Sequence, residues 1–225
     1  MATRLLYLEN MCQLQCQAHV LEVIQDGDIY KIVVDQTTFY PQGGGQPADR
    51  GVIQNEQAVF AVQGVSLENA IAYHKGIFER GFLSLQSIVE VIVDPQVRAL
   101  HNKNHTAGHL IDYALANLGY SFVSGKAYHF PQGPYVEYGG TLEQQQREQL
   151  APALEKAAQE IIDQELPVTI SLLGNDPNKR AMQVTGYPPI LCGGTHVLNT
   201  KEIGHITIRK IKNEKGNLRI SYAVS

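Results

Sequence analysis

The pattern of apolar and polar positions changes its period near residue 94. Before that point, strand-like segments occur at residues 4–8, 18–25, 30–35 and 87–93. Asp26 and Gly27 predict a hairpin turn between the second and third segments. The last segment alternates and is rich in β-branched residues, as is typical of a strand. These patterns predict a β-rich, barrel-like N-terminal domain over residues 1–94.

After residue 94 the pattern takes the period of a helix. Asp94 and Pro95 predict the start of a long helix that ends at Leu118, with Gly119 as its stop. Thr141 is expected to cap a second long helix that reaches about Glu165. Strands are expected at residues 122–130, 135–138, 167–173, 206–211 and 218–224. The predicted fold class is therefore α+β, with residues 95–225 forming an α/β domain with a mixed sheet and two long helices.

Composition narrows the class of protein. The chain has 225 residues, a net charge of -4 and a pI near 6.0, so any binding to nucleic acid must use a local basic patch. An odd count of three cysteines argues against a disulfide framework and suits a reducing compartment. The sequence shows neither a signal-peptide pattern nor an apolar run long enough for a membrane span, which predicts a cytoplasmic protein without a membrane partner.

Two histidine-containing pairs carry the most specific chemistry. In His105-Thr-Ala-Gly-His109, the spacing of four residues places both imidazoles on one helix face. Cys192-Gly-Gly-Thr-His196 is a second pair with the same spacing, in a glycine-containing loop. Together they offer three nitrogen ligands and one sulfur ligand, a set suited to zinc. Spacing alone leaves one choice open, because His101 lies four residues before His105 and forms an overlapping pair.

The segment Asn-His-Thr-Ala-x-His-Leu at residues 104–110, followed by Cys-Gly-Gly-Thr-His, resembles a known metal motif. Alanyl-tRNA synthetase editing domains, related threonyl-tRNA synthetase domains and the free-standing AlaX proteins share it. The Gly-rich segment at residues 35–51 is similar to the loop that precedes the metal domain in alanyl-type editing proteins. The resemblance covers most of the chain, is weakest over residues 52–86, and fits a medium-length AlaX protein best. It selects His105 and His109 as ligands and makes His101 a surface or outer-shell residue.

The resemblance implies a trans-acting aminoacyl-tRNA deacylase that uses Zn²⁺ and needs no ATP. Its partner would be the acceptor end of tRNA(Ala) that carries serine, with glycine as a further candidate. The implied metal ligands are His105, His109, Cys192 and His196. The implied catalytic residues are Thr37, His105, His109 and Cys192. The implied substrate-binding residues are Thr37, Thr38, Gly43, Gly44, Gly45 and Gln46.

Basic residues near the C-terminus predict contact with tRNA phosphates. They are Arg209, Lys210, Lys212, Lys215 and Arg219, and Lys179-Arg180 forms a second basic spot. Two alternatives stay open. Four protein ligands describe a closed zinc site, which fits a zinc-stabilised RNA-binding module without catalysis. Threonyl-type editing shares the metal motif, although the segment at residues 35–51 favours the alanyl type.

Overall fold

The computed structural model describes residues 2–172 and 179–225. The chain divides into two compact units, which are described separately. Unit 1 comprises Met1–Gly43 and Pro47–Ala99, and unit 2 comprises Gly44–Gln46 and Leu100–Ser225. The long helix α1, Pro95–Asn117, begins in unit 1 and continues into unit 2. Within the described residues, no helix is long and apolar enough to cross a membrane.

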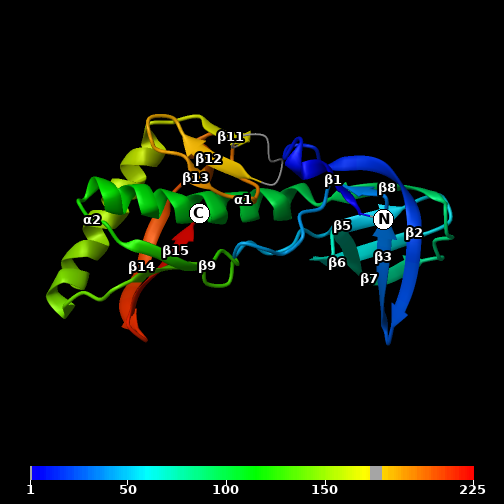
Figure 1. Cartoon of the computed structure of the whole chain (residues 1–225), viewed down its shortest axis with the longest axis horizontal. Coiled ribbons are helices and arrows are strands. Elements are labelled where there is room, and N and C mark those ends of the chain that lie inside the picture. Colours follow the sequence, from blue (N-terminus) through cyan, green and yellow to red (C-terminus); the bar gives the residue numbers. More distant parts are fainter. Residues whose placement is uncertain (1, 173–178) are drawn as a thin grey trace. The chain divides into compact units, whose positions relative to one another are not determined.

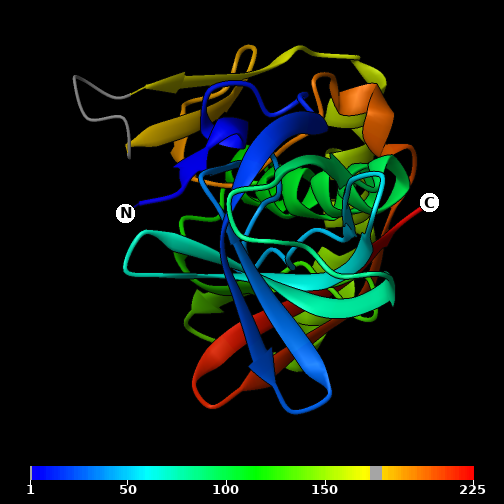
Figure 2. The same cartoon turned by 90° about the vertical axis from the view of Figure 1, so that its right-hand side faces the viewer.

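Unit 1 is built on a closed β-barrel, as the alternating pattern predicted. Its strands run in the order β2-β3-β7-β6-β5-β8, and every neighbouring pair is antiparallel (Figure 2). Their bounds are β2 Gln15–Asp26, β3 Ile29–Val34, β5 Gly51–Gln54, β6 Val59–Glu68, β7 Ile71–Arg80 and β8 Ile88–Val93. Alternate side chains such as Ile32, Ile53, Phe60 and Val91 are fully buried and form the core.

The first predicted strand is shorter than expected. Strand β1 covers only Arg4–Leu5 and pairs in parallel with β4, Gln36–Thr37. Residues Leu6–Leu8 form a 3₁₀ turn, η1. Leu6 and Tyr7 are adjacent and both buried, and a turn can bury adjacent side chains whereas a strand sends them to opposite faces. The prediction of a strand over residues 4–8 was therefore wrong beyond Leu5.

A histidine lies inside the barrel. His74 is fully buried, its Nδ1 donates to the Ile32 carbonyl at 3.0 Å, and its Nε2 lies 2.8 Å from Oγ1 of Thr37. Because Nδ1 carries the proton, Nε2 accepts the proton of the Thr37 hydroxyl. Burial lowers the pKa of His74 to about 4, although the hydrogen bond to Ile32 opposes the shift. The imidazole is therefore neutral at physiological pH.

This buried imidazole makes the stability of unit 1 depend on pH. The unfolded chain takes up a proton at His74 below pH ~6.5, but the folded chain does so only near pH 4. The free energy of unfolding should therefore decrease as the pH falls from about 6.5 to about 4, with His74 contributing up to about 3 kcal/mol. Urea unfolding at several pH values measures this. The His74→Gln variant should show a shallower decrease, and an identical slope in both proteins would contradict the prediction.

A buried ion pair holds the Gly-rich segment of unit 1 against the start of α1. Arg98 donates from Nε to both Asp49 oxygens at 3.0 Å, and its Nη2 also contacts Asp49. Its remaining donors reach the carbonyls of Met11 and Thr38, each at 2.8 Å. Asp49 in turn accepts from the backbone N–H of Tyr40 at 2.6 Å. Arg98 and Asp49 are almost completely buried, so each depends on the other for its charge partner.

In unit 2, α1 lies between two sheets (Figures 1 and 2). The first sheet has the order β14-β15-β10-β9, and the second has the order β11-β12-β13. The second helix is α2 Gln144–Asp163. The strand bounds are β9 Val123–Tyr128, β10 Tyr135–Gly139, β11 Val168–Leu172, β12 Arg180–Val184, β13 Ile190–Leu191, β14 Ile206–Glu214 and β15 Asn217–Val224. A short 3₁₀ helix, η2, covers Thr200–Ile203.

The expected mixed sheet was wrong. All strand pairs of both unit 2 sheets, within the described residues, are antiparallel. Short connections account for this arrangement, since the tight turn at Lys215 and Gly216 joins β14 and β15, whereas a parallel pair needs a long crossover. The core of unit 2 is formed by α1, α2 and the inner faces of the strands, with Leu110, Leu154, Met182 and Ile220 fully buried.

The predicted ends of α1 are confirmed, but the predicted cap of α2 was wrong. Oδ1 of Asp94 accepts from the N–H of Gln96 at 2.8 Å, and Gly119 follows the helix with a φ of +84°. Helix α2 is capped by Glu143, whose backbone N–H donates to the side chain of Gln146 in a capping box. Glu143 rather than Thr141 therefore caps the helix, which starts later than expected.

Candidate metal centre

The structure brings the two predicted ligand pairs together in unit 2. His105 and His109 lie one turn apart on α1, and Cys192 and His196 lie in the loop after β13. One ligand atom from each of these four residues lies within 4.8 Å of the others. Sγ of Cys192 is 3.3 Å from Nε2 of His105 and 3.3 Å from Nε2 of His196. The donor atoms therefore converge on one point.

Each histidine is oriented through its Nδ1 atom. Nδ1 of His105 lies 2.7 Å from Oε1 of Gln46, and Nδ1 of His109 lies 3.5 Å from a carboxylate oxygen of Asp112. Nδ1 of His196 lies 3.2 Å from Oγ1 of Thr106, whose own proton goes to the Asn102 carbonyl. These oxygens accept from Nδ1–H, so each Nε2 presents its lone pair once its ring is neutral, as outer partners of metal-bound histidines arrange.

The outer partners are themselves held by hydrogen bonds. Nε2 of Gln46 donates to Oγ1 of Thr195 at 2.8 Å, and the Thr195 hydroxyl donates to Oδ1 of Asn102 at 2.5 Å. The hydroxyl of Tyr138 donates to Asp112 at 2.6 Å. Gln46, Thr195 and Tyr138 are buried, which fixes their orientation. The ligand geometry is thus preorganised by side chains from several elements.

Burial and mutual proximity set the charge of the cluster. Burial, followed by the neighbouring histidines His196, His109 and His129, lowers the pKa of His105 well below its ordinary value. His196 shifts in the same direction, chiefly through burial and His109. Burial also opposes the charged form of His109, but Asp112 and Cys192 raise its pKa to about 9. The proton on His109 would leave when a metal ion binds.

The residues of the cluster fit a zinc ion. The buried Nε2 atom of His109 has no hydrogen-bond partner among the described residues, as expected for an atom that serves as a metal ligand. Three imidazole nitrogens and one thiol form a set of four donors of the kind that zinc binds. A zinc ion held by these four residues would polarise a carbonyl oxygen and lower the pKa of a coordinated water.

Because Gly194 has no side chain, the His105 ring can lie directly against its backbone. A Cβ atom added at Gly194 would lie 2.2 Å from Cε1 and 2.5 Å from Nδ1 of His105. The Gly194→Ala variant should therefore displace the ligand and weaken zinc binding by roughly 10–100-fold. Competition with a chromophoric chelator measures the zinc affinity. Gly193→Ala is the matched control, because a Cβ there meets nothing within 4 Å. Equal zinc affinity in both variants would contradict this role of Gly194.

Two further histidines of unit 2, His129 and His101, lie outside the cluster of four ligands. The ring of His129 stacks on His105 with centroids 4.7 Å apart, and its Nδ1 lies 2.7 Å from the Tyr222 hydroxyl, which donates to the Asn104 carbonyl. Burial, followed by the nearby His109, lowers the pKa of His129 to about 3. His101 is buried rather than on the helix surface and does not belong to the ligand cluster.

The predicted substrate-binding residues fall in both units. Thr37, Thr38 and Gly43 belong to unit 1, and both threonines are fully buried. Gly44, Gly45 and Gln46 belong to unit 2. Gly45 has a φ of +80°, and its carbonyl accepts from the N–H of His129 at 2.8 Å. Gln46 contacts His105 directly and so supports a metal ligand.

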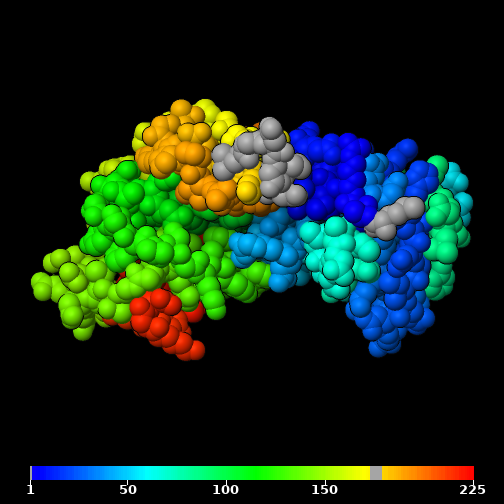
Figure 3. Space-filling model, viewed as in Figure 1, coloured from blue at the N-terminus to red at the C-terminus, as the bar shows by residue number. Residues whose placement is uncertain are grey.

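The predicted tRNA-binding residues lie on the terminal hairpin of unit 2 (Figure 3, red). Arg209 and Lys210 are exposed, whereas Lys212 and Arg219 form ion pairs with Glu214 at 3.0 and 2.9 Å. The predicted basic spot at Lys179-Arg180 was wrong in part. Arg180 is buried, and its Nη1 donates to the Gly193 carbonyl at 3.3 Å next to the metal loop.

The sequence reasoning missed several residues that support the ligands. Asp112 follows His109 by three positions on α1, a spacing that signals a shared helix face. Asn102 and Tyr138 gave no comparable signal, because their roles depend on contacts across the fold. Thr106 and Thr195 lie within the two motifs, where their proximity to the ligands was the available signal.

Two family models match the chain. Residues 182–221 match the second additional domain of threonyl and alanyl tRNA synthetases, and residues 5–97 match class II (A) tRNA synthetases. The chain is also 33% identical over 216 residues to an alanine–tRNA ligase of Trichodesmium erythraeum (strain IMS101). The chain is a relative of the alanyl-tRNA synthetases. An alanine–tRNA ligase of Bacillus velezensis is 32% identical over 235 residues.

The relationship covers most of this chain but only part of the ligases. The aligned residues make up 87% of this chain and 24% of the Trichodesmium enzyme, and 90% of this chain and 26% of the Bacillus enzyme. The chain thus spans about a quarter of the length of these synthetase relatives. Cys192 and His196 both lie within the residues that match the second additional domain.

Proposed function

We propose that this chain is a zinc-dependent deacylase that hydrolyses the ester bond between serine and tRNA(Ala), with Gly-tRNA(Ala) as a further substrate. The convergence of His105, His109, Cys192 and His196 on one point carries the proposal. The relationship to alanyl-tRNA synthetases supports the choice of tRNA(Ala). Hydrolysis of an aminoacyl ester needs an activated water and stabilisation of negative charge on the carbonyl oxygen, and zinc held by these ligands would supply both.

The residues around the ligands perform the supporting tasks. Gln46 and Asp112 hold His105 and His109 in the tautomer that presents Nε2. Thr106 does the same for His196 while its own proton is held by the Asn102 carbonyl. His129 stacks on His105 and, with its Nδ1 bound to Tyr222, closes one side of the cluster. These contacts fix the direction in which the ligand atoms point.

Serine specificity is assigned to Thr37. Its proton is bound to Nε2 of His74, and its oxygen also accepts from the N–H of Phe39 at 3.1 Å. One lone pair of the hydroxyl oxygen is left, so this oxygen can accept a hydrogen bond but cannot donate one. The serine hydroxyl can donate that hydrogen bond, and alanine has no such donor. A site built in this way favours serine and spares correctly charged Ala-tRNA(Ala).

Replacing Thr37 by valine tests this assignment. Thr37→Val keeps the shape of the side chain and removes the acceptor, so kcat/KM for Ser-tRNA(Ala) should fall by roughly tenfold. Hydrolysis of Gly-tRNA(Ala), which offers no hydroxyl, should change little and serves as the internal control. An equal loss for both substrates would assign a structural role to Thr37 instead.

The substrate comparison tests the function itself. Purified zinc-loaded protein should hydrolyse Ser-tRNA(Ala) and leave Ala-tRNA(Ala) and Ser-tRNA(Thr) largely intact. Preferred hydrolysis of Ser-tRNA(Thr) would show threonyl-type specificity. Hydrolysis of none of the three by the folded, zinc-loaded protein would favour an RNA-binding module in which zinc serves only folding.

A further inference from the structure

One face of the four-stranded sheet of unit 2 points away from the core. Across its strands, Lys210 pairs with Ser221, Ser221 with Tyr135, and Tyr135 with Tyr128. In the next row, Lys212 pairs with Arg219 and Arg219 with Glu137. Directly paired residues place their side chains on the same face. The intervening residues, Val136, Tyr138, Ile220 and Tyr222, are buried in the core.

A column of flat groups lies on this outer face. The rings of Phe130 and Tyr128 stack with centroids 4.3 Å apart and planes at 10°. Tyr128 stacks in turn on Tyr135, with centroids 5.4 Å apart and planes at 18°. The guanidinium carbon of Arg219 lies 3.4 Å from the centroid of the Tyr135 ring. Half-buried aromatic rings and guanidinium planes in such a row are surfaces on which unpaired bases stack.

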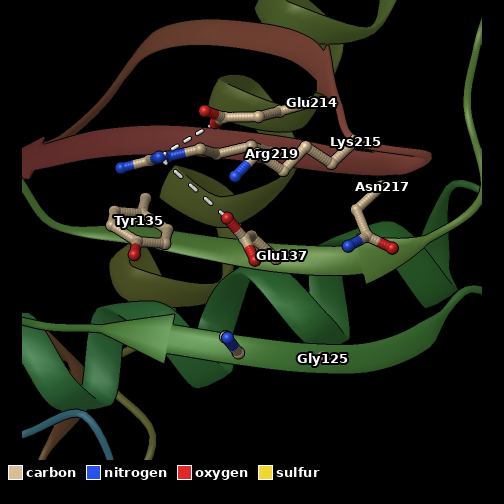
Figure 4. A pocket seen from close by; sticks show the side chains of 8 residues that line it. Gly125, Tyr135, Glu137, Glu214, Lys215, Asn217 and Arg219 are labelled. Atoms are coloured by element: carbon tan, nitrogen blue, oxygen red, sulfur yellow. Dashed lines mark hydrogen bonds and ion pairs between the residues drawn. The ribbon is translucent and has the colours of Figure 1, made fainter.

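A cavity of about 430 Å³ lies at the Arg219 end of the column. Figure 4 shows the guanidinium of Arg219 above the Tyr135 ring, with the carboxylates of Glu214 and Glu137 on either side at 2.9 and 4.0 Å. Gly125 leaves one wall without a side chain, and the amide of Asn217 lines another. Carboxylates accept hydrogen bonds from exocyclic amino groups of bases such as cytosine. The lining thus combines a stacking surface with acceptors at its edge.

The charge of this region is opposite to that of the whole chain. The four strands and the turn between β14 and β15 carry six lysine or arginine residues and two glutamates, whereas the chain has a net charge of -4. Lys126 and Lys215 are exposed at the rim of the cavity. Glu137 and Glu214 neutralise Arg219, so the exposed lysines are the groups that are available to phosphates.

We propose that this face binds an unpaired stretch of RNA. One base stacks on the Arg219 guanidinium, its exocyclic amino group donates to Glu137 or Glu214, and the flanking phosphates contact Lys126 and Lys215. The inference rests on the proposed function in that the RNA is the acceptor end of the tRNA substrate. It goes beyond that function because it assigns a base-contacting surface outside the metal centre.

The position of β9 connects this face with the metal centre. Strand β9 is an edge strand of the sheet, and no further strand of the described residues pairs with its outer side. Tyr128, at its end, joins the aromatic column, and the next residue, His129, stacks on the metal ligand His105. A single strand of RNA that passes over this edge would extend from the column toward the ligands.

Binding of RNA to a double variant tests the proposal. The double variant Lys126→Gln, Lys215→Gln should bind uncharged tRNA(Ala) roughly tenfold more weakly. The slope of its binding constant against salt concentration, on logarithmic axes, should decrease by the amount expected for the loss of about one to two phosphate contacts. Lys156→Gln is the matched control, since Lys156 is an exposed lysine of α2. Zinc content and circular dichroism establish that each variant is folded. Unchanged affinity and salt dependence in the folded double variant would overturn the proposal.

Two further measurements separate the base contact from the catalytic function. The wild-type protein should bind hexacytidylate several-fold more tightly than hexauridylate, because only cytosine carries the exocyclic amino group. Equal affinities would overturn the assigned role of Glu137 and Glu214. The double variant should hydrolyse 3′-seryl-adenosine, which lacks the flanking nucleotides, at the wild-type rate. If the wild-type protein binds RNA but hydrolyses no ester, the proposed function fails while the RNA surface stands.

Discussion

The Cys192→Ala variant is expected to lose its zinc and its hydrolysis of Ser-tRNA(Ala), with a decrease in kcat/KM of more than about 100-fold. Sγ of Cys192 lies 3.3 Å from Nε2 of both His105 and His196, so it is central to the ligand set. Without the Cys192 thiol, the site would retain only the three histidine ligands. Metal analysis of the purified variant and single-turnover hydrolysis measure the two effects.

The matched control for this variant is Cys12→Ala. Cys12 is an exposed free thiol of unit 1 and has no part in the ligand cluster. Its replacement should leave zinc content and hydrolysis at wild-type levels. Wild-type turnover by a folded, zinc-free Cys192→Ala protein would refute a role of zinc in the reaction.

The second large effect is on stability. Arg98→Met should lower the free energy of unfolding by about 3–5 kcal/mol, because it leaves the buried Asp49 carboxylate without its charge partner. The variant also removes the donors that reach the carbonyls of Met11 and Thr38. Urea unfolding followed by circular dichroism measures the change.

An exposed ion pair of the same kind provides the comparison. Arg4 pairs with Glu9 at 2.8 Å, but both side chains are more than half exposed. Water and salt screen such a pair, so Arg4→Met should leave the unfolding midpoint nearly unchanged. A comparable loss of stability in the two variants would show that burial of the Arg98–Asp49 pair is not the cause.

The sequence predicted the parts of the fold that depend on local pattern. The strand-like segments predicted barrel strands β2, β3 and β8, and Asp94 with Gly119 predicted both ends of α1. The prediction from sequence was wrong where two nearby residues could serve the same purpose. Thr141 was the predicted cap of α2, but Glu143 caps the helix together with Gln146. The sheet arrangement of unit 2 depends on pairing between distant strands, which no local period encodes.

The ligand set could be predicted because metal chemistry restricts both residue type and spacing. His105 and His109 are selected by helix geometry together with the family resemblance, and the structure places Cys192 and His196 beside them. The outer partners could not be predicted in the same way. Gln46 lies 59 positions from His105 in the sequence, and its hydrogen bond depends on how the Gly-rich segment folds into unit 2.

The most direct test of the proposed mechanism is the hydrolysis of Ser-tRNA(Ala) by metal-free protein before and after zinc is restored. Circular dichroism during the same experiment monitors the fold. We expect hydrolysis to be lost with the metal, while the barrel of unit 1 stays folded, and to return in proportion to zinc bound, up to one ion per chain. Full hydrolysis by folded protein without metal would contradict the account.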